Sequence, residues 1–280
     1  MTRTTRSPAL PTPRLRYARC DLARGGRIAS ACGHADCPRC DPRRAFELFS
    51  AEGREGGAGR ALALPPRPVL IYHVPRSGGS FLAEVLERLE VAVLRPDLEG
   101  EADATSELLR TGARRGLVIF GHTAAAVKAR HPDVEFDEYG ACWRDPFEIS
   151  ASEFHGIRDA EPGHHLFEHH LRAECLACDS VADWVERFAR TNPISAVLSG
   201  NRPEMLRASH YAADVADLLK RLFGRDVDLV ADFGFRPEAL RPGQWVQRAS
   251  RQDLLRLREL HAEDYALGAA LGRRAALQRG

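Results

Sequence analysis

The side chains best suited to bind a phosphate or sulfate group lie in one short segment, Arg-Ser-Gly-Gly-Ser. Arg76 supplies a cation, and Ser77 and Ser80 supply hydroxyl donors. Gly78 and Gly79 allow the backbone to approach a ligand closely. A guanidinium beside several backbone N–H donors is an arrangement that binds anionic oxygens well. The segment is therefore predicted to be an anion-binding loop.

Strand-forming residues precede this loop, and a helical pattern follows it. Residues 69–72 are Val, Leu, Ile and Tyr, and apolar residues recur at helical spacing over residues 81–89. In such a unit the positive end of the helix dipole and the first backbone amides, here as far as Phe81, point at one spot. The same pattern also fits a tight turn whose glycines bind no ligand.

The loop differs from the common nucleoside-triphosphate loop. That loop, GxxxxGK[ST], needs a lysine directly after its last glycine, and Ser80 stands at this position here. The cation, Arg76, precedes the glycines instead. An arginine offers an anion a planar fork of donors rather than a point charge.

A second segment that could bind phosphate is WRDPFEISASEF, residues 143–154. Arg144 follows a predicted strand, Pro146 suits the first position of a helix, and Ser152 lies two turns along that helix. A guanidinium and a hydroxyl placed in this way would reach one phosphate. The alternative is a local ion pair, in which Arg144 and Asp145 only cap the helix.

The two segments together resemble the sulfotransferases that use 3′-phosphoadenosine 5′-phosphosulfate (PAPS). Residues 73–80, HVPRSGGS, match the family's donor loop, H-x-P-[KR]-[ST]-G-[GST]-[ST], and are most similar to the HIPKTGGT loop of its Golgi-type and bacterial branch. Residues 144–154 resemble its 3′-phosphate segment, R-D-P-x-x-R-x-x-S-x-[YF], with Ile149 in place of the middle arginine. This replacement puts one secondary contact in doubt.

The resemblance extends over about residues 69–271. The further segments that resemble the family are GHTAAAV from Gly121, TNPISAVLSG from Thr191, VDLVADFGF from Val227 as its final strand, and a closing helix in residues 257–271. Predicted strands at residues 69–72, 91–94, 116–122 and 139–143 alternate with helical patterns, which indicates an α/β fold with a mostly parallel sheet. The resemblance implies that this fold is P-loop-NTPase-like.

The resemblance also implies a reaction, the transfer of a sulfuryl group from PAPS to an acceptor hydroxyl or amine, with 3′-phosphoadenosine 5′-phosphate (PAP) as the product. Arg76 would neutralise charge on the leaving group, and the loop residues from Ser77 to Phe81 would hold the 5′-phosphate. Arg144 and Ser152 would hold the 3′-phosphate. The expected acceptor is a carbohydrate, a glycolipid or a small metabolite, and residues 155–180 are expected to line its side of the cleft.

A hydroxyl acceptor also needs a base, and His122 is the first candidate. It follows a predicted buried strand, and a histidine is suited to proton transfer near neutral pH. Relatives of the 2-O-sulfotransferase type use a histidine in the matching Gly-His segment. Glu84, one turn into the first helix, is the alternative base, and a purely structural role for His122 also fits the sequence.

Composition and charge indicate the class of protein. The chain has 280 residues, of which 44% are hydrophobic, and its net charge of +1 gives no field that favours nucleic acid. It has no apolar run long enough to span a membrane and no secretory signal, so a cytoplasmic, bacterial protein is expected. The sequence predicts an N-terminal extension (residues 1–67), an α/β domain (68–272) and a short tail (273–280).

The N-terminal extension is rich in cysteine, and Cys20, Cys32, Cys37 and Cys40 are candidate ligands of a structural zinc ion, with His34 as a further ligand. The alternative is a set of reduced thiols. A second pair, Cys175 and Cys178, follows several histidines that either join it in binding a metal or face solvent. The odd total of seven cysteines argues against a disulfide framework.

Two other classes of function fit parts of the sequence. A nucleotide-dependent kinase would use the same strand, loop and helix, although the missing GK[ST] signature disfavours it. A zinc-bearing protein without catalytic activity would use the cysteines, although the intact Arg76, Arg144 and Ser152 disfavour this alternative. The sequence gives neither the identity of the acceptor nor the oligomeric state.

Overall fold

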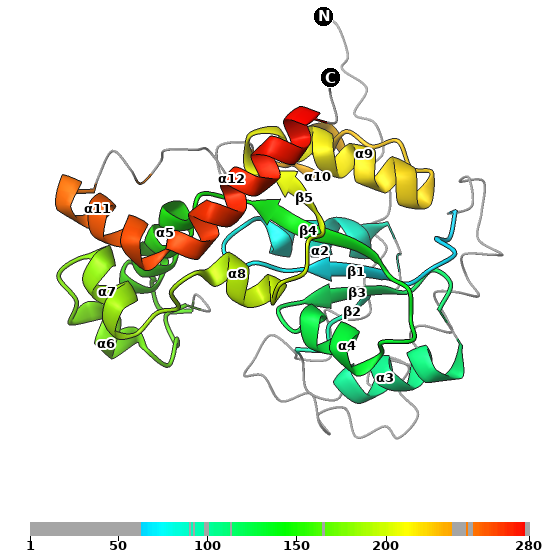
Figure 1. The fold of residues 1–280 in the computed structure, drawn as a ribbon, viewed down its shortest axis with the longest axis horizontal. Coiled ribbons are helices and arrows are strands. Elements are labelled where there is room, and N and C mark those ends of the chain that lie inside the picture. Colours follow the sequence, from blue (N-terminus) through cyan, green and yellow to red (C-terminus); the bar gives the residue numbers. More distant parts are fainter. Residues whose placement is uncertain are drawn as a thin grey trace, which may run out of the picture.

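A computed structural model describes residues 63–89, 91, 93–97, 101–112, 114–163, 166–236, 245 and 249–277. These residues form a parallel β-sheet with helices on both faces and a helical lobe beside the sheet (Figure 1). The four cysteines predicted to bind zinc, together with His34, lie outside the described residues. Within the described part of the chain, no helix is both long and apolar enough to cross a membrane.

The sheet has five described strands in the order β2-β3-β1-β4-β5, and every neighbouring pair is parallel. The prediction of an α/β fold with a mostly parallel sheet is therefore confirmed. The strands are β1 (Val69–Tyr72), β2 (Val93–Leu94), β3 (Val118–Gly121), β4 (Asp137–Trp143) and β5 (Glu204–Arg207).

The first strand, β1, lies at the centre of the sheet, and this position determines where a ligand can bind. Val69 pairs with Val118 of β3 on one side and with Asp137 of β4 on the other. The chain completes β2 and β3 on the first side and then crosses β1 to form β4, so the strand order reverses beside β1. In open parallel sheets, ligands bind outside the carboxyl ends of the strands at such a reversal.

One face of the sheet is covered by the first described helix and by two helices from the later part of the chain. Val69 and Ile71 of β1 pack there against α2 (Gly79–Arg88), α9 (Tyr211–Phe223) and α10 (Leu229–Phe233). Successive side chains of a strand point to opposite faces, so these two residues share a face. This core fixes the start of α2 directly behind the predicted anion-binding loop.

The other face of the sheet carries a second core. Leu70 and Tyr72 of β1 point into it, and α3 (Glu101–Thr111), α4 (Ala124–Arg130) and α8 (Pro193–Leu198) cover it. All four residues of β1 are buried, as expected for a central strand covered on both faces. The loop that follows β1 therefore extends from one of the best-supported parts of the molecule.

A helical lobe lies beside the sheet, at the left of Figure 1. It consists of α5 (Pro146–Arg158), α6 (Arg172–Leu176), α7 (Val181–Arg187) and α11 (Arg251–Leu260), which pack around the fully buried Trp184. Helix α5 begins directly after β4 and extends into the lobe. It therefore connects the carboxyl edge of the sheet with the third core.

The last helix, α12 (Ala262–Leu277), ties the lobe to the sheet through its first turn. The buried carboxylate of Asp264 accepts hydrogen bonds from the amides of Ile194 (2.9 Å) and Ser195 (2.7 Å) at the start of α8. Asn192, which precedes α8, has a left-handed backbone with φ +50°. The Thr-Asn-Pro segment is thus a helix start held by a carboxylate from the end of the chain.

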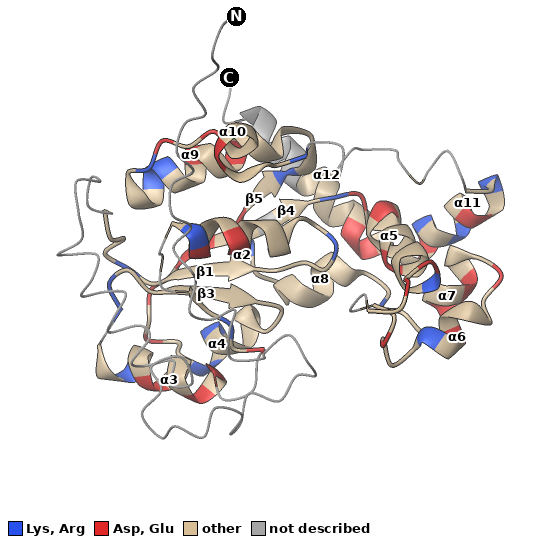
Figure 2. Cartoon of the chain, turned by 180° about the vertical axis from the view of Figure 1, so that it is seen from behind, with Lys and Arg blue, Asp and Glu red and all other residues tan. Residues whose placement is uncertain are grey.

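Charged residues of both signs are mixed along the helices, as Figure 2 shows for α7, α9 and α11. Many of them form exposed pairs, such as Arg207 with Asp214 and Arg221 with Glu204. Exposed pairs of this kind contribute little to stability, about 0–1 kcal/mol each. The charges that bear on a ligand are the few that lie at the carboxyl edge of the sheet.

The predicted final strand at residues 227–235 is wrong, because this segment contains the short helix α10. The carboxylate of Asp228 accepts a hydrogen bond from the amide of Val230 at 2.9 Å and caps the helix start. Gly234, with φ +69°, ends the helix in a left-handed conformation. These local caps outweigh the strand preference of the apolar residues between them.

Sequence patterns failed to reveal the edge strand β5. In β5 only Leu206 is buried, so the segment lacks a clear apolar pattern, and a short 3-10 helix, η2 (Ala208–His210), follows it directly. The closing helix predicted in residues 257–271 is in fact two helices, α11 and α12, with a break at His261. The break allows the buried ring of His261 to bond to its neighbours.

Candidate active site

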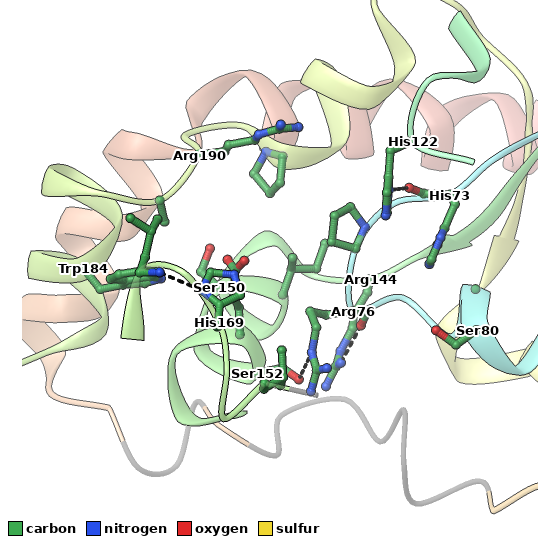
Figure 3. Close-up of a pocket in the computed structure, with 18 of the residues that line it drawn as sticks. His73, Arg76, Ser80, His122, Arg144, Ser150, Ser152, His169, Trp184 and Arg190 are labelled. Atoms are coloured by element: carbon green, nitrogen blue, oxygen red, sulfur yellow. Dashed lines mark hydrogen bonds between the residues drawn. The ribbon is translucent and has the colours of Figure 1, made fainter. Parts of the chain in front are cut away.

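A cavity of about 750 Å³ lies outside the carboxyl ends of β1, β3 and β4 and extends towards the helical lobe (Figure 3). The lining includes six of the residues predicted to contact phosphate: Arg76, Gly78, Gly79, Ser80, Arg144 and Ser152. His122, the first candidate base, also lines it. Two segments far apart in the sequence therefore meet in one cavity of a size typical of small-molecule sites.

The predicted loop has an unusual backbone that its surroundings hold in place. Arg76 has φ +58°, a left-handed conformation that costs energy for a residue other than glycine, and Gly78 has φ +83°. The Ser77 hydroxyl donates to the Val74 carbonyl at 2.6 Å, and the Tyr211 hydroxyl donates to the Gly78 carbonyl at 2.8 Å. These contacts prearrange the loop without a ligand.

Ser77 and Phe81 are placed differently from the other predicted loop residues. Ser77 is fully buried, and its hydroxyl bond to Val74 supports the loop from within. The Phe81 amide donates to the Gly78 carbonyl at 3.1 Å, and its ring packs against Phe235, with ring centroids 5.0 Å apart. The residues at the start of α2 that line the cavity are therefore Gly79 and Ser80.

Gly79 leaves space for the buried ring of His73. A Cβ atom at this position would lie 2.0 Å from His73 Cδ2, far inside van der Waals contact. The side chain of His73 is 7% exposed and has little room to move. The close approach of loop and ring explains why a glycine stands at the start of α2, in addition to any role in ligand binding.

Replacement of Gly79 by alanine is expected to lower the free energy of unfolding by about 1–3 kcal/mol, because the new methyl group overpacks the His73 ring. Denaturant unfolding of the two proteins measures this difference. The same replacement in a His73→Ala background serves as the control, since the clashing ring is absent there. An equal loss of stability in both backgrounds would show that the contact with His73 is not the cause.

Arg76, Arg144 and Ser152 form a connected group at the centre of the cavity (Figure 3). The Arg76 Nε atom donates to Ser152 Oγ at 3.2 Å, and Arg144 Nη1 donates to the Arg76 carbonyl at 2.7 Å. The two arginines are 68 residues apart in sequence. The side chains predicted to hold the two phosphates of the donor thus lie together before any ligand binds.

Arg144 has both a structural and a ligand-facing part. Its side chain is 5% exposed, and Nη2 lies 3.6 Å from a carboxylate oxygen of Glu148, which is 1% exposed. Burial lowers the pKa of Arg144, and the charge of Glu148 opposes this shift. Within the described part of the chain, the buried Nε atom has no hydrogen-bond partner, so the protein does not satisfy every donor of this guanidinium.

His122 is oriented as a base would need to be. Its Nδ1 atom bonds to the His73 carbonyl, which can only accept, so Nδ1 carries the proton. In the neutral form of the ring, the Nε2 atom then has a free lone pair. The rings of His122 and His73 stack with centroids 4.4 Å apart, which fixes the plane of the His122 ring at the cavity.

His73 supports this arrangement in its neutral form. Burial lowers the pKa of His73 to about 3, with smaller contributions from His122 and from the positive charge of Arg95. Its ring contacts Phe120 of β3, with centroids 4.9 Å apart. His73 is therefore a neutral support between the sheet and His122 rather than a cation of the site.

Glu84, the alternative base, does not line the cavity. Its side chain is 59% exposed on α2, where it lies 3.9 Å from Arg88 in an ion pair one turn along the helix. Of the two candidate bases, only His122 is at the cavity.

No family model, no curated protein and no solved structure matches this chain. Its function has to be inferred from the residues and geometry of the cavity.

Sequence patterns did not point to the carboxylate of the cavity, Glu153, or to Trp184 and Arg190. Glu153 directly follows Ser152 on α5, so its place beside a predicted phosphate contact was the one available signal. Trp184 and Arg190 come from α7 and the segment after it, whose position depends on how the lobe packs. The expectation that residues 155–180 contribute to the cleft fits the presence of four of them in the lining: Leu166, His169, His170 and Leu171.

Ser150, His261 and Asp264 lie close together but do not form a hydrolase triad. Ser150 Oγ is 2.9 Å from His261 Nε2, and the amide of Asn192 donates to His261 Nδ1 at 3.1 Å. Because Nδ1 accepts this bond, the proton of the neutral ring is on Nε2, which donates to Ser150 and cannot take its proton. Burial lowers the pKa of His261, consistent with a neutral ring that connects α5 to α8.

The second cysteine pair lies in the core of the lobe. Cys175 and Cys178 are buried free thiols, and burial raises the pKa of Cys175 to about 11. The described residues contain no group of three or more histidine, cysteine or acidic side chains that could hold a metal ion. The two thiols therefore pack as small apolar side chains in this structure.

Proposed function

We propose that this protein transfers a sulfuryl group from PAPS to a hydroxyl or amine of a small-molecule or glycan acceptor. The observation that carries the proposal is the group of Arg76, Ser152 and Arg144, which hydrogen bonds join to one another beside the glycine loop. Sulfotransferases of the resembled family use these residue types for the 5′- and 3′-phosphates of their donor. The hydrogen bonds that join these residues support the proposal that one nucleotide contacts all three.

The donor end of the cavity has the donors that such a nucleotide needs. The amides at the start of α2 and the Ser80 hydroxyl would bind the 5′-phosphate at the positive end of the helix. The Arg144 guanidinium and the Ser152 hydroxyl would bind the 3′-phosphate. When bound, PAPS supplies the sulfuryl group and a phosphate leaving group.

The residues of the chain would mainly position groups and balance charge. The Arg76 guanidinium, which donates to Ser152 in this structure, would stabilise negative charge that develops on the leaving phosphate. Such transfers pass through loose transition states that need alignment more than covalent help from the protein. The Nε2 atom of His122 would accept the proton of the acceptor hydroxyl.

We also propose that the fold is P-loop-NTPase-like, since a phosphate-binding loop follows the central strand of a parallel sheet and leads into a helix. That relationship leaves a nucleotide-dependent kinase as the second candidate, because the loop amides would also suit ATP. The absence of lysine after Gly79 and the placement of Arg144 beside the loop favour a donor with a 3′-phosphate.

Calorimetric titration of the purified protein with PAP, and with ATP and ADP in parallel, tests the donor class. We expect PAP to bind at least about tenfold more tightly than either nucleotide, because only PAP offers a 3′-phosphate to Arg144 and Ser152. Preference for ATP would favour the kinase. Absence of PAP binding by folded protein would overturn the sulfotransferase proposal.

A further inference from the structure

The cavity continues beyond the glycine loop towards the helical lobe, where its lining becomes more apolar. Apolar side chains of α7 and of the segment before α6 form the wall there: Leu166, Leu171, Trp184 and Phe188. The cavity must hold both donor and acceptor, so only a small group of an acceptor can enter it. An apolar wall at this end favours an acceptor with an apolar body.

Glu153 is the carboxylate among the described residues that line the cavity. It lines the cavity beside Ser152, and its carboxylate forms no hydrogen bond or ion pair with any residue that the structure describes. Burial raises the pKa of Glu153, while the charges of Arg76 and Arg190 oppose the shift. A partly buried carboxylate without hydrogen-bond donors is costly unless a ligand supplies them.

A donor bound at the glycine loop would raise the free-energy cost of leaving the Glu153 carboxylate without a positively charged partner. Arg76, one of the two cations near Glu153, is the residue proposed to turn its charge to the donor. The donor itself is strongly anionic, so the adjoining volume then has a negative potential. Arg190 is exposed, and solvent and salt screen its charge more than that of Glu153.

His169, which also lines the cavity, adds no positive charge that would offset Glu153. Burial lowers the pKa of His169, and the neighbouring His170 lowers it further, so His169 is neutral near pH 7. Their rings stack with centroids 4.6 Å apart at the edge of the cavity. Glu153 is thus the anionic side chain of the lining, and none of the described arginines forms an ion pair with it.

We propose that the part of the cavity lined by Glu153 binds an amphipathic amine, whose ammonium group contacts Glu153 and whose apolar body lies against Leu171 and Phe188. The acceptor class is then a small amino alcohol with an apolar ring or chain, whose hydroxyl accepts the sulfuryl group, rather than an anionic compound. The role of this ligand as acceptor rests on the proposed sulfotransferase function. Its binding does not, because Glu153 and the apolar wall belong to the chain itself.

Three probes with the same aromatic body and different charge test this proposal: 2-phenylethylamine, 2-phenylethanol and phenylacetate. Their affinities are measured by ligand-observed NMR titration, with the protein saturated with PAP and again without PAP. We expect the amine to bind about tenfold more tightly than phenylacetate, with the alcohol between them. Glu153→Gln should remove most of this difference, while PAP affinity stays within about twofold.

Glu161→Gln is the matched control, because Glu161 is an exposed carboxylate close in sequence that does not line the cavity. It should leave the order of the three probes unchanged. Phenylacetate binding as tightly as the amine, an unchanged order in Glu153→Gln, or no binding of any probe at millimolar concentration would overturn the proposal. Failure of PAP alone to bind would count against the sulfotransferase function, and the probe order measured without PAP would still decide this inference.

Discussion

Replacement of Arg144 by alanine is expected to weaken PAP binding by about 1.5–3 kcal/mol and to lower the free energy of unfolding by about 3–5 kcal/mol. Binding weakens because a charge-assisted contact to the 3′-phosphate is lost. Stability falls because the Glu148 carboxylate, which is 1% exposed, loses the guanidinium 3.6 Å away. Calorimetric titration and denaturant unfolding measure the two effects.

A second variant separates the two roles of Arg144. Combining Arg144→Met with Glu148→Gln removes both buried charges, so much of the lost stability should return. Glutamine keeps an oxygen for the Trp245 amide, which donates to Glu148 Oε1 at 3.1 Å. PAP affinity should stay low in this stable double variant. If it returned to the parent value, Arg144 would be a structural residue without a direct part in phosphate binding.

The His122→Ala variant is expected to turn over PAPS about a hundredfold or more slowly than the parent protein, with PAP affinity within about twofold. The imidazole Nε2 atom is the proposed proton acceptor, and its loss leaves only solvent to take the proton. Formation of PAP from PAPS, with a hydroxyl acceptor that supports turnover by the parent, measures the effect.

Glu84→Gln provides the comparison for this experiment. Glu84 is exposed and lies outside the lining of the cavity, so its replacement should change turnover little. A large loss in Glu84→Gln together with near-normal turnover in His122→Ala would move the proton acceptor to Glu84. It would also require α2 to rearrange when ligands bind.

The sequence indicated which residues of the glycine loop and of the Arg-Asp-Pro turn lie at the cavity, because each signal there is local. Apolar residues of β1, the two glycines and the Arg-Asp-Pro turn act over a few residues, and each lies at the start or end of a regular element. The meeting of Arg76 with Arg144 then follows from parallel strands, whose carboxyl ends share one edge. The side chain of Ser77 was less predictable, since its inward rotation depends on the turn of the backbone at Arg76.

The distal end was not predictable in the same way. Glu153 and Trp184 have no diagnostic spacing, and the cavity includes them because the lobe helices pack around Trp184. Helix α10 shows the opposite case, in which local cap residues indicate a helix and the apolar residues between them indicate a strand. Asp228 before the helix and Gly234 after it are typical helix caps, whereas the apolar residues between them suggested a strand.

Helix α5 belongs at once to the edge of the sheet and to the core of the lobe. Ser150 and Ser152 on this helix are bonded to His261 and Arg76, so both ends of the cavity depend on where one rigid element lies. The lobe cannot unfold without also removing a contact of the donor loop. Ligand binding and the folding of the lobe are therefore coupled. A ligand that binds only to the intact cavity stabilises the folded lobe through its free energy of binding.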